Sequence, residues 1–538
     1  MKDRIRVNWT AAVLMVVQIL VLLFFAGQKK GYFIDEIYSW GLSNSYYKPF
    51  VASYDVFDRW IDGDVFEDYM TVGEGERFAY GSVYYNQTQD VHPPLYYMLF
   101  HTLCSLTPGV FNKWQGILLN VFFYGGCLAM IFLTARRLTK SEGAALAAMA
   151  VWGFSPGGLS TGIYIRMYMM MAFFSIATVY LHVRMAEEGQ GRRILAAVCA
   201  VTFLGLLTQY YFVFLAFFLS AVYVLWKLQK QKWKEASVYA AALFASVGLM
   251  VLVYPALITQ LARTDEFVAS ETRNNLLNGS VMVRNLISYV SDINMDFFSG
   301  RIREAAAVMA LFLGFGLWRN RKKGGGRKVK VSLDANDRIA LALALVWVLS
   351  FLAVSGAAVV TGVRYIYNLY PLFCVLLVWA GRGITGWALK GTKACGMVRA
   401  GILAAGGILF LTGFRLGYVR YLYPENEERV RLARQYEDLY CLYINNYENA
   451  PLTQDLMELS GFRGVYVMPK EEIERVQELA EGKDWKKGLV VYVDTNDFWS
   501  SGYDGTEVME KLKAETKARE YVYLYAHELS ETYLLKWE

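Results

Sequence analysis

Long uncharged apolar stretches recur through the first 418 residues, separated by short polar segments. A helix that crosses a bilayer needs roughly 20 apolar residues. The stretch 9–27 has this length, and because no small-residue cleavage pattern follows it, we interpret it as an uncleaved first span and not as a signal peptide. The pattern predicts further spans at 114–134, 143–162, 166–184, 194–208, 212–227, 237–258, 304–318, 339–360, 365–381 and 398–417.

Basic residues indicate which ends of these spans face the cytoplasm, because Lys and Arg collect in cytoplasmic loops. All basic loops fall on one side if the apolar segment 93–106 does not cross the membrane. That segment has only 14 residues, so we predict an interfacial helix on the outer surface. The result is eleven spans, with the N-terminus cytoplasmic and the C-terminus outside; the basic loops lie at 136–140, 184–193, 227–234, 319–338 and 382–399.

The chain beyond the last predicted span has a different composition. Residues 418–538 carry 15 Lys+Arg against 24 Asp+Glu, a net charge of −9, which leaves +15 for the rest of a chain whose total is +6. Strand-like and helix-like patterns alternate there, with strands expected at 464–468, 489–493 and 520–525 and helices at 429–437, 471–480 and 506–513. We therefore predict a transmembrane domain at 1–418, which includes a first extracytoplasmic loop at 29–112, and a small extracytoplasmic α/β domain at 419–538.

Composition excludes several classes of protein. Charged residues make up 19% and hydrophobic residues 55% of the 538 positions, whereas soluble domains carry about 25% charged residues. This excludes a soluble single domain, a disordered chain and a nucleic-acid binder, and six cysteines are too few for a disulfide scaffold. The expected fold class is a multi-spanning α-helical membrane protein of the cell membrane, with the lipid bilayer around it.

Two adjacent carboxylates, Asp35 and Glu36, follow the first span closely. Ionisable groups beside a bilayer are costly and usually functional. Partial desolvation raises the pKa of a carboxylate and makes it a better base. The alternative is an acidic surface turn, and the pair alone does not exclude it.

The segment 90–97, Asp-Val-His-Pro-Pro-Leu-Tyr-Tyr, is a second candidate. Two prolines fit the first turn of a helix, where their missing N–H groups would lack partners anyway. Asp90 opens this segment, and His92 stands just before the helix, where it can be aimed at a neighbouring group. A plain helix start with an incidental histidine is the alternative.

Arg166 and Arg364 lie at span ends that face outward in this topology, against the positive-inside trend. A guanidinium binds phosphate with a planar fork. Snorkelling to lipid headgroups would explain one such arginine, but two on the same side as Asp35 and His92 favour an anionic partner. The polar-aromatic break at 209–211, which contains Tyr210, emerges on that side too.

In this order, the features resemble the membrane glycosyltransferases of the GT-C fold. The chain is most similar to the bacterial group related to protein O-mannosyltransferases and lipid A aminoarabinose transferases. The resemblance covers residues 1–418, and its most specific parts are the pair at 35–36 and the segment 90–97. The C-terminal domain shows no such resemblance.

The resemblance implies transfer of a sugar from a polyprenyl-phosphate carrier to an acceptor outside the cytoplasm, which could be a glycan, a lipid or a protein. Asp35 would be the catalytic base, and Glu36 would support it or contact the acceptor. A poor hydroxyl nucleophile needs such a base, a phosphate leaving group needs cations, and a single displacement inverts the anomeric centre. No metal cofactor is implied; the expected substrate-binding residues are Asp90, His92, Arg166, Tyr168, Tyr210, Arg364 and Tyr365.

Two other functions stay open. One is a transporter or flippase for a lipid-linked sugar, although transporters place ionisable groups near the bilayer midplane and here the polar groups gather at one face. The other is a catalytically inactive membrane scaffold. The glycosyltransferase hypothesis requires that Asp35 and Arg364 meet in one cavity open to the outer leaflet.

Overall fold

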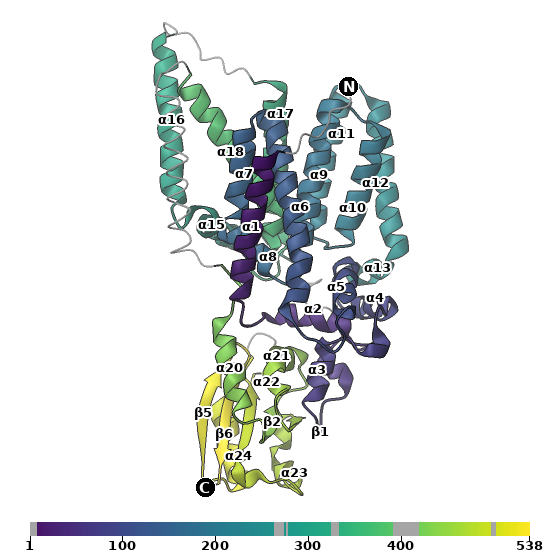
Figure 1. Cartoon of the computed structure of the whole chain (residues 1–538), viewed down its shortest axis with the longest axis vertical. Helices are drawn as coiled ribbons and strands as arrows, with labels where there is room; N and C mark the ends of the chain where they lie inside the picture. Colours follow the sequence, from purple (N-terminus) through teal and green to yellow (C-terminus); the bar gives the residue numbers. More distant parts are fainter. Residues whose placement is uncertain are drawn as a thin grey trace. The chain divides into compact units, whose positions relative to one another are not determined.

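The computed structural model describes residues 8–262, 274–275, 278–323, 333–390, 419–496 and 502–537. The chain forms two compact units (Figure 1). Unit 1 contains Met1–Gly27 and Ile117–Arg420, and unit 2 contains Gln28–Gly116 and Tyr421–Glu538. The sequence prediction assigned 29–112 to the transmembrane domain, whereas the structure groups this segment with the C-terminal tail.

Unit 1 is helical. Helices of membrane-spanning length and composition number seven among the described residues. They are α1 (Trp9–Gly27), α6 (Lys113–Thr139), α9 (Tyr168–Glu188), α11 (Phe212–Gln229), α12 (Trp233–Val253), α17 (Ala335–Ala357) and the continuous stretch Val363–Ala388, which joins η3 (Val363–Leu369) to α18 (Tyr370–Ala388). The multi-pass membrane class is therefore as predicted, but the count of eleven spans is not reached; the expected span 398–417 lies outside the described residues.

The expected span 143–162 is two helices, α7 (Glu142–Gly153) and α8 (Pro156–Ile163). Pro156 has no N–H to continue the helical ladder. The side chain of Ser155 instead accepts a hydrogen bond from the N–H of Gly158 at 3.0 Å, which starts a new helix. The proline inside the apolar run therefore divides the predicted span into two helices.

Three other predicted spans also differ from the structure. The segment 194–208 lies in α10 (Arg192–Leu206), which has only 15 residues. The segment 237–258 divides between α12 and the short α13 (Ala256–Ala262). The segment 304–318 lies in α16 (Ile302–Lys323), which is long enough but carries charged residues near both ends. The helix α15 (Gly279–Phe298) precedes it.

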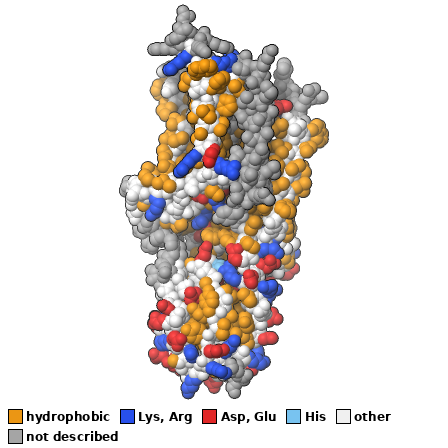
Figure 2. All heavy atoms as spheres, turned by 90° about the vertical axis from the view of Figure 1, so that its left-hand side faces the viewer, with side chains coloured by type: hydrophobic (Ala, Val, Ile, Leu, Met, Phe, Trp, Pro, Cys, Tyr) orange, Lys and Arg blue, Asp and Glu red, His pale blue; other side chains and the backbone are white. Residues whose placement is uncertain are grey.

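Large apolar side chains on these helices face outward. Phe122, Phe244, Leu252 and Leu311 are each more than 70% exposed. Figure 2 shows hydrophobic side chains along the helices of unit 1 and charged side chains over the surface of unit 2. Apolar surface of this extent is what a helix presents to lipid.

The basic loops collect at one end of unit 1. Arg137, at the end of α6, pairs with Glu187, at the end of α9, at 2.6 Å. The backbone carbonyl of Arg137 accepts a hydrogen bond from the side chain of Asn336, at the start of α17, at 3.2 Å. Arg382 of α18 donates to Ser141, the cap of α7, at 3.0 Å. These contacts bring together segments that the charge pattern assigned to one side of the membrane.

Unit 2 is built around a six-stranded sheet in the order β1-β3-β2-β4-β6-β5. Strands β2 (Tyr440–Ile444), β3 (Gly464–Met468) and β4 (Leu489–Asp494) are parallel and wholly buried, as expected for strands covered on both faces. Strands β5 (Glu520–Ala526) and β6 (Ser530–Lys536) complete one side in antiparallel fashion.

Strand β1 (Trp60–Ile61) comes from the first loop and pairs with β3 of the tail, so that Trp60 lies opposite Tyr466. The indole of Trp60 also packs edge-on against Tyr440 and Tyr466 at 5.1 and 5.4 Å between ring centroids. This pairing is one of the contacts that join residues 28–116 to the tail. Helices join them as well: α2 (Ile34–Asn44) packs against α21 (Asn449–Gln454), and α3 (Asp64–Met70) against α22 (Leu456–Leu459).

The sequence predicted β3, β4 and β5 closely but missed β2 and β6. The helix expected at 471–480 is a 3₁₀ turn, η4 (Lys470–Arg475), followed by the short α23 (Val476–Leu479). The other helices of the tail are α20 (Pro424–Arg434), α21 (Asn449–Gln454), α22 (Leu456–Leu459) and α24 (Gly505–Thr516). A short 3₁₀ turn, η5 (Trp485–Lys487), precedes β4.

The first loop adds its own helices to unit 2. The segment predicted as an interfacial helix forms α5 (Leu95–Ser105), which packs against α2 (Ile34–Asn44) and α4 (Tyr80–Gln89). Tyr96, Tyr97 and Phe100 are completely buried there. The other elements are η1 (Val51–Tyr54), α3 (Asp64–Met70) and η2 (Glu74–Glu76).

Candidate active site

The two carboxylates after the first span lie in the first turn of α2 and differ in their surroundings. Glu36 is fully buried, and its Oε2 accepts hydrogen bonds from Lys29 Nζ and from the N–H of Phe33, both at 2.8 Å. Asp35 is half-buried. A negative charge at the start of a helix is stabilised by the helix dipole. Of the two roles expected for Glu36, its burial in an ion pair favours support over contact with an acceptor.

Tyr38, one turn further along α2, experiences the charges of both Asp35 and Asp90. Burial raises the pKa of Tyr38 to about 12, with further increases from the charges of Asp35 and Asp90. The side-chain amide of Asn449 donates a hydrogen bond to the Tyr38 hydroxyl at 2.9 Å. Tyr38 was missed by the sequence analysis, although its position three residues after Asp35 on a helix places both on one face.

His92 is oriented by Asp90. Its Nδ1 lies 2.7 Å from Asp90 Oδ2, and both side chains are 16% exposed. The structure therefore pairs two of the sequence-predicted residues, Asp90 and His92, in the same unit as Asp35. An imidazole held through one nitrogen presents the other in a fixed direction.

Unit 1 gathers a second group of the predicted residues. Tyr365 packs edge-on against Tyr168 at 6.4 Å and stacks on Tyr211 at 4.8 Å between ring centroids. The Arg364 guanidinium lies 5.2 Å from the centroid of the Tyr365 ring. Tyr168 in turn stacks on Tyr164 at 5.6 Å. The expected aromatic lining and one of the two expected arginines thus share one cluster.

Two more predicted residues lie in unit 1. Arg166 is only 4% exposed, and its backbone N–H donates to the carbonyl of Tyr164 at 2.8 Å. The hydroxyl of Tyr210 donates to Gln260. Asp35 and Arg364 belong to different units, so the meeting of base and guanidinium stays a prediction.

The sequence analysis missed a charged network at the start of the tail. Arg420 forms ion pairs with Asp292 at 2.9 Å and with Asp296 at 2.7 Å, and Asp296 also accepts a hydrogen bond from the Tyr370 hydroxyl at 2.7 Å. Burial raises the pKa of Asp292 to about 6, while Arg420 opposes this rise. The four-residue spacing of the two aspartates, which puts them on one helix face, was the available signal.

Among the described parts of the chain, no three His, Cys, Asp or Glu side chains are grouped so as to hold a metal ion. The expectation that the reaction needs no metal remains a prediction from the resemblance.

Comparison with solved structures defines the fold class. Over 98% of both chains the structure is similar to ArnT from Cupriavidus metallidurans bound to undecaprenyl phosphate, with a TM-score of 0.51 and 11% identity. The apo form of an Archaeoglobus fulgidus oligosaccharyltransferase matches over 91% of this chain and 70% of its own, with a TM-score of 0.45 and 10% identity. The match to ArnT over 98% of both chains gives this chain the GT-C fold of membrane glycosyltransferases, as its motifs predicted.

One family model matches part of the sequence. Residues 91–258 match the family described as dolichyl-phosphate-mannose-protein mannosyltransferase. This stretch includes His92, Arg166, Tyr168 and Tyr210 of the predicted site. A comparison with curated proteins found none that matches.

Proposed function

We propose that this protein transfers a sugar from a polyprenyl-phosphate-linked donor to an acceptor at the outer face of the membrane. The observation that carries the proposal is the GT-C fold over the whole chain, together with the family match at 91–258. The ArnT structure with undecaprenyl phosphate supports a lipid phosphate carrier for this fold.

In the proposed reaction, an acceptor hydroxyl attacks the anomeric carbon of the donor sugar while its proton passes to Asp35. The bond between the anomeric carbon and the phosphate oxygen breaks, and polyprenyl phosphate leaves with the electron pair. One displacement of this kind inverts the anomeric centre. Glu36, held by Lys29 and the N–H of Phe33, fixes the helix start that carries Asp35, and the Asp90–His92 pair contacts substrate beside it.

The donor phosphate is assigned to the arginines of unit 1. Arg364 provides a guanidinium beside the Tyr365 ring stack, and Arg166 is the second candidate. Cations at the leaving phosphate stabilise the charge that develops there and make a general acid unnecessary. Tyr168 and Tyr365 supply apolar faces for the sugar or for the first isoprene units. Tyr210 is proposed as a further substrate contact.

The proposed orientation follows from the basic end of unit 1. Since Arg137, Arg382 and their neighbours lie at one end, the positive-inside rule assigns that end to the cytoplasm. The chain enters unit 2 after α1 and leaves it at the start of α6, the opposite end of that helix from Arg137, so this assignment makes unit 2 extracytoplasmic. A cysteine-accessibility assay on intact cells, with single cysteines at exposed positions of unit 2, tests this assignment.

The substitution Asp35→Asn tests the mechanism. Loss of a general base lowers a rate by about 10²–10⁴-fold, so the variant should fail to restore the sugar missing from the envelope glycans of a deletion strain, while the carrier-linked sugar accumulates. Mass spectrometry of both pools measures this. Asp68→Asn, an exposed aspartate on α3 of the same unit, is the matched control. Full activity of Asp35→Asn would remove this residue from the mechanism.

Transfer by the purified, detergent-solubilised chain distinguishes an enzyme from a flippase. In detergent there is no second leaflet to which a lipid could be moved, so only an enzyme produces a glycosylated acceptor. Movement of the lipid-linked sugar in vesicles without any transfer in detergent would favour the transporter.

A further inference from the structure

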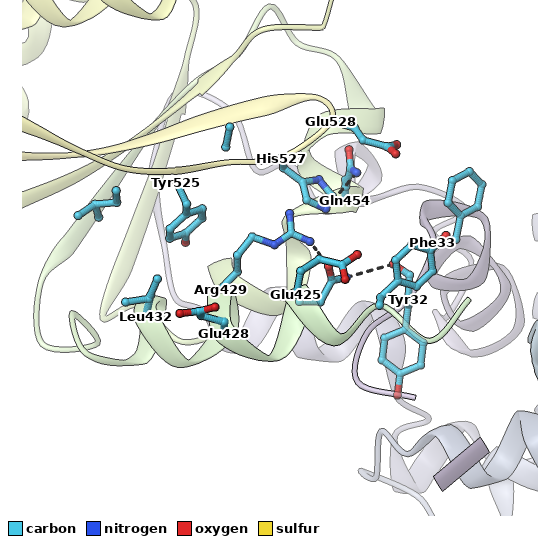
Figure 3. A pocket seen from close by; sticks show the side chains of 14 residues that line it. Tyr32, Phe33, Glu425, Glu428, Arg429, Leu432, Gln454, Tyr525, His527 and Glu528 are labelled. Atoms are coloured by element: carbon cyan, nitrogen blue, oxygen red, sulfur yellow. Dashed lines mark hydrogen bonds between the residues drawn. The ribbon is translucent and has the colours of Figure 1, made fainter. Parts of the chain in front are cut away.

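Unit 2 contains a cavity of about 480 Å³ that the sequence motifs did not indicate. Four parts of the unit supply its wall: the segment ahead of α2, the helix α20 with the residue before it, the last residue of α21, and the end of β5 with the turn that follows (Figure 3). We call it the α20 cavity. Its volume lies in the range of about 300–1,000 Å³ that holds small ligands.

The lining of the α20 cavity combines aromatic faces with polar groups. Tyr32, Phe33, Tyr423 and Tyr525 line it, and Phe33 and Tyr423 are stacked with ring centroids 6.5 Å apart. Aromatic rings present apolar faces with a polar edge. A sugar ring is complementary to such a wall, because its C–H faces pack on aromatic rings while its hydroxyl groups need donors and acceptors around the rim.

The charge of the cavity excludes anionic ligands. Three carboxylates, Glu425, Glu428 and Glu528, line it together with one guanidinium, Arg429. With His527 neutral, this lining carries two net negative charges. A phosphate or a uronic acid would be repelled, whereas hydroxyl groups donate readily to carboxylate oxygens.

Three buried polar atoms at the cavity have no hydrogen-bond partner among the described residues: Nε of Arg429, Oε1 of Gln454 and Nδ1 of His527. Arg429 is only 8% exposed, and its guanidinium group points toward Gln454 and His527 (Figure 3). A buried polar group without a partner costs about 1–3 kcal/mol. A ligand hydroxyl can accept from the arginine N–H and donate to the amide oxygen, so the same kind of group satisfies both.

From this lining we propose that the α20 cavity binds a saccharide that carries no negative charge. The cavity adjoins the proposed catalytic residue, because Phe33 caps α2 and Asp35 lies two residues further along that helix. We assign the bound saccharide as the acceptor. That assignment rests on the proposed function, whereas the binding of the saccharide does not.

Saturation-transfer NMR on the full chain in lipid nanodiscs tests the proposal. The probes are three matched disaccharides: one of neutral hexoses, one containing a hexosamine and one containing a uronic acid. We expect the neutral or the hexosamine probe to bind and the uronate to give no signal. The double variant Glu425→Gln/Glu528→Gln removes two exposed charges. It should therefore lower the affinity for the probe that binds by about 10-fold and reduce the discrimination against the uronate.

Glu427→Gln is the matched control, since Glu427 is on the same helix but outside the lining and pairs with Lys30. It should bind like the unchanged protein. The proposal is overturned if no probe binds, if the uronate binds as well as the neutral sugar, or if the double variant keeps full affinity. Asp35→Asn should bind the saccharide normally while losing transfer. Retained transfer in that variant would therefore refute the mechanism and leave saccharide binding standing.

Discussion

Replacing Lys29 with methionine should destabilise the helix start that carries Asp35. Lys29 Nζ lies 2.8 Å from Glu36 Oε2, both side chains are completely buried, and Nζ also donates to the carbonyl of Tyr421 at 2.6 Å. Methionine keeps most of the aliphatic stem but leaves the Glu36 carboxylate buried without its cation. Removing one partner of a buried ion pair costs about 3–5 kcal/mol, which is a large share of the ~5–15 kcal/mol that stabilises a typical domain.

Hydrogen exchange of α2 peptides measures this loss, because amide protection reports the free energy of local opening. At about 1.4 kcal/mol per factor of ten, a loss of 3–5 kcal/mol makes exchange roughly 100- to 4,000-fold faster. The double variant Lys29→Met/Glu36→Gln removes the orphaned charge, so it should recover most of the protection. A change below 10-fold in Lys29→Met, or a double variant that exchanges no more slowly, would refute this account of the pair.

Two further predictions concern buried carboxyl groups. Burial raises the pKa of Asp494 from 3.8 to about 7, so the folded state binds this proton more tightly than the unfolded state does. Protonation of Asp494 therefore stabilises the fold by up to about 4 kcal/mol, at ~1.4 kcal/mol per pKa unit. This stabilisation is complete below pH 3.8 and is lost as the pH rises through about 7. Asp494→Asn should remove this decline in the unfolding midpoint of unit 2 between pH 4 and pH 8, and an unchanged pH profile would contradict it. Arg420→Met leaves the buried Asp296 without its guanidinium and should lower the free energy of unfolding by about 3–5 kcal/mol, measured by thermal unfolding. The exposed control Arg303→Met should have little effect. Equal unfolding midpoints for the two variants would argue against a stabilising network.

Local patterns in the sequence predicted the elements whose signals are local. Apolar runs located the membrane helices, and alternating apolar and β-branched residues located β3, β4 and β5. The break at Pro156 was also a local signal, but the apolar residues on both sides of it concealed the interruption. The strand β2 was missed because its five buried residues follow the helix α20 after a short polar segment that resembles a helix end.

Contacts between distant parts of the chain could not be predicted in this way. The pairing of Trp60 with Tyr466 helps to join the first loop to the tail, and no local pattern encodes it. The same holds for Arg420, whose partners Asp292 and Asp296 are more than a hundred residues away. Asp35, Asp90 and His92 were proposed from their chemistry and stay predictions, whereas Tyr38 was not considered because a single tyrosine in an aromatic-rich chain is not distinctive.

The composite sheet of unit 2 imposes an order on biosynthesis. The ribosome makes Trp60 long before Tyr466, and every helix from α6 to α18 is translated between them. Strand β1 therefore has no partner in the sheet until translation reaches β3. Membrane insertion must precede completion of the sheet, so a stall during insertion leaves an open strand edge that invites aggregation.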